Sequence, residues 1–507
     1  MIGFWISLVT FALHASALHN YGLVGDEMYF IACSKHLAWG YVDQPPLVAI
    51  AALLAAPFGY SPVAMRVLPA ICAALAALFA AAIARELGGG RFAQGLAAVA
   101  TALVPAYLLL GNLLVTTSFE PLSWTLVIYF VIRLVKTHNS VYWFAIAAAF
   151  TFGMYGKYSM LLLGATIALG LLLTPERRVF RTPLFPIAAL LSLLAIAPNL
   201  VWQWSHGWPF LGVLHGDFQH RHPFQSGLML EYKNLGVNAL AFIGEQFLYT
   251  SPVAAVLWIW GLSSLMVANR MREYRWLAVA FALLIVAAIV LAGKGYYVIA
   301  IYASLIAAGC VALERSWKGV FARAGAVAVL LVGTLPLVPF TLPVLSIHDF
   351  LAYSAALHLT GQNGTPPHVI QPLYAQEFGW EHFTARVARV YDALPPLVRQ
   401  RTAIFADTYG EAGALALYGP SYHLPTIIGS QNNFYLWGPQ GYDGRSMLVV
   451  GATQQATIRK LFLHVTLVTT IANPYEWVLQ GPDPVYYCTD PVAPLPQIWP
   501  QLGWYGA

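Results

Sequence analysis

A series of long apolar runs constrains this chain more than any other feature of its sequence. Each run is long enough to cross roughly 30 Å of hydrocarbon as a helix. A backbone inside lipid must satisfy its own hydrogen bonds, so these segments are expected to be helical. We therefore predict an α-helical polytopic membrane protein with about eleven transmembrane helices. The runs lie at about 3–19, 63–85, 92–111, 121–136, 141–155, 158–173, 183–203, 246–268, 276–293, 296–312 and 320–340.

The composition excludes an ordinary soluble protein. Hydrophobic residues make up 59% of the chain and charged residues 9%, whereas soluble domains carry about 25% charged residues. The bilayer must therefore solvate most of the apolar surface, and membrane lipid is an expected partner. The net charge is +5, without a long basic block, so no nucleic-acid partner is expected.

Lysine and arginine gather in alternate short loops, which orients the chain across the membrane. Because cytoplasmic loops carry the excess of these residues, we expect the N-terminus in the cytoplasm and everything after about 341 in the periplasm. The predicted location is the inner membrane of a bacterium. The basic loops contain Arg85 and Arg91; Arg133 and Lys136; Arg177, Arg178 and Arg181; Arg270, Arg272 and Arg275; and Arg315, Lys318 and Arg323.

The first apolar run leaves two alternatives open. Residues 1–17 end in Ala15-Ser16-Ala17, which imitates a signal-peptidase site. No basic segment precedes the run, however, so we favour an uncleaved first span.

Two outer loops and the C-terminal segment differ in composition from the apolar runs. In the tail, RTAIFADTYGEAGALALYG and SMLVVGATQQATIRKLF each follow a strand, turn and helix pattern, and HVTLVTTI indicates a further strand. We therefore predict that the tail is a small α/β domain. The predicted organisation is a transmembrane domain over 1–340, with periplasmic loops at 20–62 and 205–245, and a periplasmic soluble domain over 341–507.

Four cysteines show no metal-binding or redox spacing. Cys72 and Cys310 fall inside apolar runs, where a cysteine acts as a small hydrophobe. Cys33 and Cys488 could pair outside the membrane, although nothing in the sequence requires it.

Ionisable residues in or beside the membrane are costly, so they indicate a functional site. In this chain they gather near the outer ends of the apolar runs, and the cytoplasmic halves of the runs carry almost none. This asymmetry disfavours a secondary transporter, which needs access from both sides. A transporter and a lipid-binding protein without catalysis remain as alternatives. The residues are Asp26, Glu27, Asp43, Arg66, Glu120, Lys157, Glu245 and Lys294.

Several of these residues lie in motifs that resemble one family. GDEMYFIACSKHLAWGYVDQPPLVA resembles the first-loop signature of the GT-C superfamily, which includes bacterial aminoarabinose transferases and protein O-mannosyltransferases. AMRVLPAI, NLLVTTSFEPLSWTLVIYF, FGMYGKYSMLLL and LAGKGYYVIAIYASLIAAG resemble later segments of that family in the same order. The resemblance covers roughly residues 20–310.

The resemblance implies a GT-C bundle and an inverting glycosyltransferase. Such an enzyme would move a hexosyl or pentosyl group from a polyprenyl-phosphate donor to a periplasmic glycolipid, polysaccharide or protein. This reaction needs a base for the acceptor and positive charge for the departing phosphate, and the resemblance places Asp26 as the base. The candidate residues are Asp26, Glu27 and Glu120 for catalysis, Arg66, Lys157, Lys294 and Tyr297 for the donor phosphate, and Asp43, Tyr29 and Glu245 for the acceptor or for support.

The resemblance also implies that Glu120 helps to position either a divalent metal ion, which would bind at Asp26 and Glu120, or the acceptor. Glu120 stands where many relatives have aspartate, and its longer side chain moves the carboxylate oxygens by about one methylene. Chemistry without a metal therefore stays open as the alternative.

Each candidate also has a structural alternative. Asp26 and Glu120 could serve only as helix-start charges. The cationic residues could extend toward the membrane interface without a catalytic role, and Tyr297 could belong to an aromatic belt.

Overall fold

The computed structural model describes residues 1–219, 235–291, 293–358, 372–451, 455–473, 475 and 482–506. The chain divides into two compact units. We call them the helical unit (Met1–His19, Arg66–Val201 and Arg221–Val344) and the mixed unit (Asn20–Met65, Trp202–His220 and Leu345–Ala507). The sequence predicted two domains that are each continuous in the chain, with a boundary at 340/341. The mixed unit is instead discontinuous, because it contains the first loop as well as the tail.

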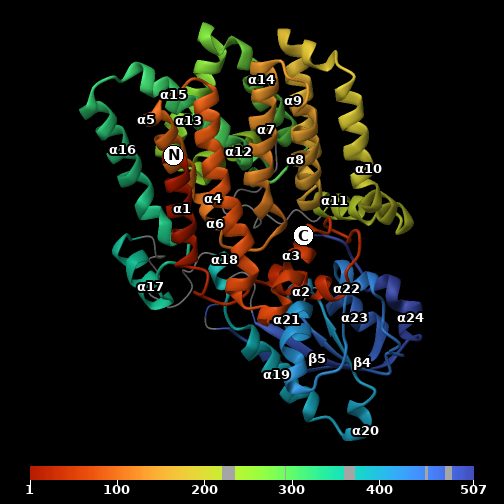
Figure 1. Cartoon of the computed structure of the whole chain (residues 1–507). Helices are drawn as coiled ribbons and strands as arrows, with labels where there is room; N and C mark the ends of the chain where they lie inside the picture. Colours follow the sequence, from red (N-terminus) through yellow and green to blue (C-terminus); the bar gives the residue numbers. More distant parts are fainter. Residues whose placement is uncertain are drawn as a thin grey trace. The chain divides into compact units, whose positions relative to one another are not determined.

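Most of the helical unit consists of apolar helices joined by short turns (Figure 1). Its first half contains α1 (Ile2–Ala15), α4 (Pro62–Glu86), α5 (Arg91–Ala102), α6 (Pro105–Leu110), η2 (Thr116–Phe119), α7 (Glu120–Thr137), α8 (Tyr142–Gly156), α9 (Ser159–Leu172), η3 (Pro175–Phe180) and α10 (Leu184–Ser205). Its second half contains α12 (Leu235–Thr250), α13 (Pro252–Val267), η4 (Asn269–Tyr274), α14 (Arg275–Val290), η5 (Gly295–Ile301), α15 (Tyr302–Ser316), α16 (Val320–Thr334) and η6 (Leu335–Phe340).

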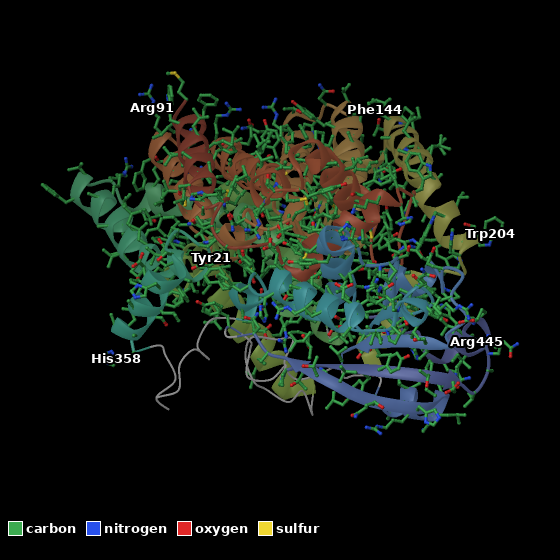
Figure 2. All side chains as sticks on the ribbon, turned by 90° about the horizontal axis from the view of Figure 1, so that it is seen from below. Tyr21, Arg91, Phe144, Trp204, His358 and Arg445 are labelled. Carbon is green, nitrogen blue, oxygen red and sulfur yellow. The ribbon has the colours of Figure 1, made fainter. Side chains whose placement is uncertain are left out.

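The helices are those of a multi-pass membrane protein. Within the described residues, 6 helices are long and apolar enough to cross a membrane, or up to 7 if one bent pair is a single span. The helices Ile2–Ala15, Leu47–Phe58 and Ser159–Leu172 are apolar but shorter. The count of about eleven spans stays a prediction. Trp204 near the end of α10 is 71% exposed and points away from the protein (Figure 2), which is typical of a tryptophan where a helix leaves the bilayer.

Breaks in the helices fall where the sequence carries proline or an extended residue. The run at 92–111 was predicted as one span and is instead divided between α5 and α6, because Pro105 cannot continue a hydrogen-bonded helix. The run at 246–268 bends by 109° between α12 and α13, where Ser251 has a φ of 67° and Pro252 begins the next helix. The predicted boundary between 141–155 and 158–173 is confirmed by the end of α8 and the start of α9.

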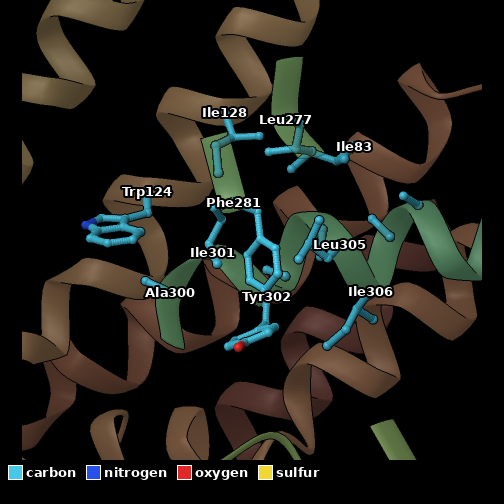
Figure 3. Packing of buried hydrophobic residues seen from close by; sticks show 14 of the residues in the cluster. Ile83, Trp124, Ile128, Leu277, Phe281, Ala300, Ile301, Tyr302, Leu305 and Ile306 are labelled. Carbon is cyan, nitrogen blue, oxygen red and sulfur yellow. The ribbon is translucent and has the colours of Figure 1, made fainter. Parts of the chain in front are cut away.

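The core of the helical unit is a layer of large apolar side chains. Trp124, Phe281 and Tyr302 lie among branched aliphatic residues in this cluster (Figure 3). Helices α13 and α15 approach backbone to backbone, because a Cβ at Gly261 or Gly309 would collide with the main chain of the facing helix. Small residues at such contacts are typical of helix pairs in membranes.

The mixed unit contains helices and one sheet. The first loop and the segment after α10 contribute α2 (Gly25–Lys35), α3 (Leu47–Ala55), η1 (Ala56–Phe58) and α11 (Pro209–Gln219). The tail contributes α17 (Ile347–Ala356), α18 (Pro372–Ala375), α19 (Trp380–Asp392), α20 (Pro396–Arg399), β1 (Ala403–Ala406), α21 (Tyr409–Tyr418), η7 (Gly419–Tyr422), β2 (Ile427–Gly429), α22 (Asn432–Leu436), β3 (Ser446–Val450), α23 (Gln455–Leu461), β4 (Phe462–Ile471), β5 (Asp483–Pro491), α24 (Leu495–Ile498) and η8 (Trp499–Gln501).

The sheet has the strand order β2-β1-β3-β5-β4. Strands β2, β1 and β3 are parallel, and β5 and β4 continue the sheet in antiparallel fashion. The tail is therefore an α/β structure, and the predicted strand, turn and helix pattern is confirmed at β1 with α21 and at β3 with α23. Both β1 and β3 are buried along their whole length, as expected for strands in the middle of a covered sheet.

The first loop packs on the tail through helices α2 and α21. A Cβ at Gly25 would lie 3.1 Å from the Cα of Gly410, and a Cβ at Gly413 would lie 2.8 Å from the main-chain nitrogen of Tyr29. The main-chain N–H of Gly22 also donates to the carbonyl of Glu377 at 3.1 Å. The glycines let the two helices approach closely, so the first turn of α2 is held by the tail.

All four cysteines belong to the described residues, and all four are free and buried. Cys33 lies in α2, and Cys488 in β5 faces Met447 and Val465 in the neighbouring strands. The alternative that Cys33 and Cys488 form a disulfide is not realised in this structure.

Candidate functional site

Lys157 lies in the break between α8 and α9. Its backbone is extended (φ −159°, ψ 143°), which ends α8 and turns the side chain out of the helical path. The ammonium donates to Thr117 Oγ1 at 2.9 Å and lies 5.0 Å and 4.6 Å from the ring centroids of Tyr296 and Tyr297. The faces of the two aromatic rings stabilise the cation and hold it beside η5.

Glu120 lies three residues after Thr117, the residue that accepts the hydrogen bond from Lys157. It is the first residue of α7, its side chain is 3% exposed, and it accepts a hydrogen bond from the Ser159 hydroxyl. Its carboxylate also interacts electrostatically with Lys157. The position at the start of α7 agrees with the helix-start alternative, and the Ser159 and Lys157 contacts add a link to the break between α8 and α9.

Glu245 extends the same polar region toward η5. Its carboxylate lies against Gly295, where it leaves no room for a side chain. The neighbouring Gln246 donates to the Gly295 carbonyl at 3.1 Å and accepts from the Tyr302 hydroxyl at 3.1 Å. Lys294 immediately precedes η5, which places Lys294 and Tyr297 on the element that Gln246 anchors. The helical unit thus brings together five predicted site residues: Glu120, Lys157, Glu245, Lys294 and Tyr297.

Arg66 is the remaining predicted cation of the helical unit. It lies near the start of α4, and its side chain is fully buried. A buried guanidinium needs partners for its charge, and a planar fork of N–H donors suits phosphate and carboxylate oxygens. Snorkelling to the membrane surface, the structural alternative for this residue, does not fit a side chain with 0% exposure.

In the mixed unit, α2 presents the acidic pair of the first loop. Asp26 and Glu27 both lie in the first turn, where the helix dipole favours negative charge. Glu27 is fully buried, and its carboxylate accepts the main-chain N–H of Val24 at 3.1 Å. Glu27 therefore caps the helix, which gives it a structural role, whereas Asp26 is partly exposed.

Tyr29 and Asp43 form the second polar group of the first loop. The Tyr29 hydroxyl lies 2.8 Å from Asp43 Oδ1 and 2.8 Å from Asn433 Oδ1 in α22. Burial and the neighbouring Asp43 raise the pKa of Tyr29 well above its usual value, so the hydroxyl keeps its proton and donates it. Asn433 Oδ1 also accepts the main-chain N–H of Val42 at 2.9 Å. A tail residue therefore holds both α2, through Tyr29, and the chain that follows it, through Val42.

The described residues contain no group of three or more histidine, cysteine, aspartate or glutamate side chains that could hold a metal ion. The metal at Asp26 and Glu120 stays a prediction.

Residues 43–202 match a family model described as dolichyl-phosphate-mannose-protein mannosyltransferase. Among solved structures, the chain is similar to ArnT from Cupriavidus metallidurans, which is bound to undecaprenyl phosphate. The TM-score is 0.57 at 16% identity, over 96% of this chain and 97% of that chain. The similarity to the ArnT structure shows a shared fold, and the family match applies to residues 43–202.

Other GT-C structures are similar at lower scores. The archaeal oligosaccharyltransferase AglB from Archaeoglobus fulgidus, in complex with an inhibitory peptide and a dolichol-phosphate, has a TM-score of 0.44 at 12% identity, over 88% of this chain and 69% of that chain. The arabinofuranosyltransferase AftD from mycobacteria has a TM-score of 0.39 at 16% identity, over 96% of this chain and 40% of that chain. No curated protein matches this chain significantly.

Sequence reasoning missed three polar residues of the site. Thr117 and Ser159 contact Lys157 and Glu120, and Asn433 contacts Tyr29. Thr117 and Ser159 lie inside the quoted motifs, so neighbouring hydroxyls were a usable signal. Asn433 lies in SQNNFYLWGP. The only sequence feature that could have identified it as a site residue is the pair of asparagines beside apolar residues. The part of the predicted outer loop 205–245 between 220 and 234 lies outside the described residues.

Proposed function

We propose that the protein is an inverting glycosyltransferase that moves a sugar from a polyprenyl-phosphate donor to an acceptor in the periplasm. The GT-C fold and the match of residues 43–202 to a mannosyltransferase model support this proposal. The similarity to ArnT, whose structure holds undecaprenyl phosphate, supports the class of donor. The observation that carries the proposal is the Lys157 ammonium, held by Thr117 and two tyrosine rings beside the buried Glu120.

Lys157 is proposed to bind the donor phosphate. Its cation lies in a partly buried, largely apolar setting, where an added phosphate oxygen would gain more than in water. Lys294 precedes the η5 segment whose tyrosines pack on Lys157, and Arg66 offers a planar donor set for two phosphate oxygens. The protein must supply positive charge at the leaving group, because the polyprenyl phosphate departs as an anion.

Asp26 is proposed to act as the base. The acceptor hydroxyl or amine attacks the anomeric carbon on the face opposite the phosphate, and its proton passes to the Asp26 carboxylate. The bond between the anomeric carbon and the phosphate oxygen breaks, and the electron pair leaves with polyprenyl phosphate. The sugar is transferred with inversion, and no external reductant or oxidant is needed. Asp43 and Tyr29 support the first loop around this step.

The proposed location is the inner membrane of a bacterium, with the N-terminus in the cytoplasm and the tail in the periplasm. The distribution of lysine and arginine among the loops supports this orientation. The acceptor is proposed to be a glycolipid, polysaccharide or protein of the cell envelope.

The test is transfer or donor hydrolysis by purified protein in detergent, with a panel of radiolabelled polyprenyl-phosphate sugars. Wild type is compared with Asp26→Asn and with Asp392→Asn, an exposed aspartate of the tail. We expect sugar release from at least one donor, its loss in Asp26→Asn with donor binding intact, and normal activity in Asp392→Asn.

Full turnover by Asp26→Asn would remove this residue from the role of base. Failure of every donor to bind a protein that unfolds cooperatively on heating would contradict the glycosyltransferase proposal as a whole. Retention of configuration in the product would contradict the single-displacement mechanism.

A further inference from the structure

A second basic region lies in the helical unit, at the ends of α13 and α15 and the start of α16. Helix α13 packs against both α15 and α16. Their ends line an open cavity of about 850 Å³, and its lining includes Arg270, Arg315, Lys318 and Arg323. None of these residues belongs to the candidate site.

The single carboxylate lining this cavity is already engaged. Glu314 accepts the main-chain N–H groups of Gly90 and Ala93, at the N-terminus of α5. A carboxylate in this position is bound by the orphan donors and by the positive end of the helix dipole. The lining thus holds four cationic side chains against one carboxylate, and the pocket has an excess of positive charge.

Two of the cations also have structural partners. Arg315 donates to the Leu87 carbonyl at 3.1 Å, and Arg323 donates to the carbonyls of Trp317 and Glu314 at 2.8 Å and 3.1 Å. These bonds hold the end of α15, so both guanidiniums are fixed in position. Arg270 and Lys318 form no ion pair with a carboxylate within the described part of the chain.

The surface beside the cavity is apolar. Val267 lines the cavity and is 75% exposed, and Val320 and Phe321 beside Lys318 are 71% and 89% exposed. Trp260 and Trp317 meet edge to face at 6.0 Å in the same region. Exposed aliphatic residues flanked by tryptophan are typical of the level where a membrane helix meets the lipid headgroups.

We propose that this cavity binds the headgroup of an anionic phospholipid. The phosphate would lie between Arg270 and Lys318, with the fixed guanidiniums of Arg315 and Arg323 contributing to the field. The acyl chains would cover Val267, Val320 and Phe321, which a free phosphate ion could not do. Basic pockets between membrane helices are suited to lipids of this kind. The proposal is independent of the glycosyltransferase reaction.

The test measures lipid binding to the full-length protein by native mass spectrometry and by thermal stabilisation in detergent. The probes are phosphatidylglycerol, phosphatidylcholine, a polyprenyl phosphate and inorganic phosphate. The variant Arg270→Gln/Lys318→Gln is compared with Arg177→Gln/Arg178→Gln, which removes the same charge from an exposed turn of the same predicted membrane side.

We expect phosphatidylglycerol to bind and stabilise wild type and the control, and to bind the Arg270/Lys318 variant about thirtyfold more weakly, or about 2 kcal/mol. Equal binding by the two variants would overturn the proposal. Equal stabilisation by phosphatidylcholine or by inorganic phosphate would also overturn it. The proposal requires a ligand with both an anionic headgroup and acyl chains, and phosphatidylcholine lacks the net negative charge while inorganic phosphate lacks the chains. Stronger, variant-sensitive binding of polyprenyl phosphate would assign the cavity to that lipid instead.

Discussion

Asn433 Oδ1 accepts the main-chain N–H of Val42 at 2.9 Å, although 391 residues separate the two in sequence. The same oxygen lies 2.8 Å from the Tyr29 hydroxyl. One amide of the tail therefore holds both the end of the first-loop signature and the tyrosine in its helix. The tail is part of the structure that supports the proposed base, because Asp26 lies in the same helix as Tyr29.

Replacing Asn433 should loosen this support. Asn433→Leu leaves the buried N–H of Val42 without its acceptor, at a cost of about 1–3 kcal/mol. We expect a lower melting temperature and a lower rate of sugar transfer, with the affinity for the donor little changed. Asn433→Asp keeps an acceptor oxygen and should retain more of the stability. The control is Gln440→Leu on the exposed surface, and an equal melting temperature for Asn433→Leu and this control would contradict the prediction.

Removing the charge of Lys157 should weaken donor binding. Lys157→Met keeps much of the side-chain volume, but it removes the cation that contacts Thr117 and the tyrosine rings. A hydrogen bond to a charged group contributes about 1.5–3 kcal/mol, so we expect roughly a 10- to 150-fold loss of affinity for a polyprenyl phosphate. Equilibrium binding of a labelled lipid measures this, with Lys460→Met on the tail surface as the control. Unchanged affinity would assign the phosphate to other cations.

The stability of the mixed unit should depend on pH through Glu411. Burial, Asp483 and Asp407 raise the pKa of Glu411 well above its usual value. A raised pKa in the folded state means that stability is greatest below the pKa of the unfolded chain and falls as pH rises toward the folded value. Glu411→Gln keeps an acceptor for the main-chain N–H of Thr408, which Glu411 binds at 2.8 Å, and it cannot ionise.

We therefore expect Glu411→Gln to raise the melting temperature relative to wild type at pH 8 and to change it little near pH 4. Thermal unfolding of both proteins across this range measures the difference. A constant difference at every pH would show that ionisation of Glu411 does not control stability.

A side chain at Gly413 should separate α2 from α21. A Cβ there would lie 2.8 Å from the Tyr29 nitrogen and 2.9 Å from the Met28 carbonyl carbon, and main-chain atoms cannot move aside cheaply. Overpacking of this kind costs about 1–3 kcal/mol. Gly413→Ala should therefore lower both the melting temperature and the transfer rate. Gly325→Ala in α16, where a Cβ meets open space, should have no destabilising effect.

The sequence predicted the helices and strands that depend mainly on their own residues, and it missed those that depend on pairing with distant segments. β1 and α21 could be predicted because RTAIFADTYGEAGALALYG carries a strand, turn and helix pattern, and in the structure Thr408 and Glu411 form a capping box at the start of α21. β2 was not predicted, since three residues between turns carry too little pattern, and its place beside β1 depends on parallel pairing at a distance. The run at 92–111 was expected to form one continuous helix and is divided at Pro105, because hydropathy gave the apolar run more weight than the proline.

The residues of the candidate site likewise fall into those that the sequence could identify and those that it could not. Charges near the membrane are visible in a sequence because they are rare and costly, which is why Lys157, Glu120 and Arg66 could be predicted. Their neutral partners are ordinary residue types, so Thr117 and Asn433 carry no comparable signal. The capping role of Glu27 depends on the backbone N–H of Val24, which only the fold locates.

The pairing of Tyr29 with Asn433 also sets an order of events during biosynthesis. The two residues are 404 positions apart, so at about 5–20 residues per second the ribosome completes the second about 20–80 s after the first. During that interval the first loop lacks its partner in the tail, and α2 cannot acquire its final packing. A nascent chain stopped before Asn433 would therefore contain the acidic pair and every apolar run, yet it would lack the packing that holds the first turn of α2.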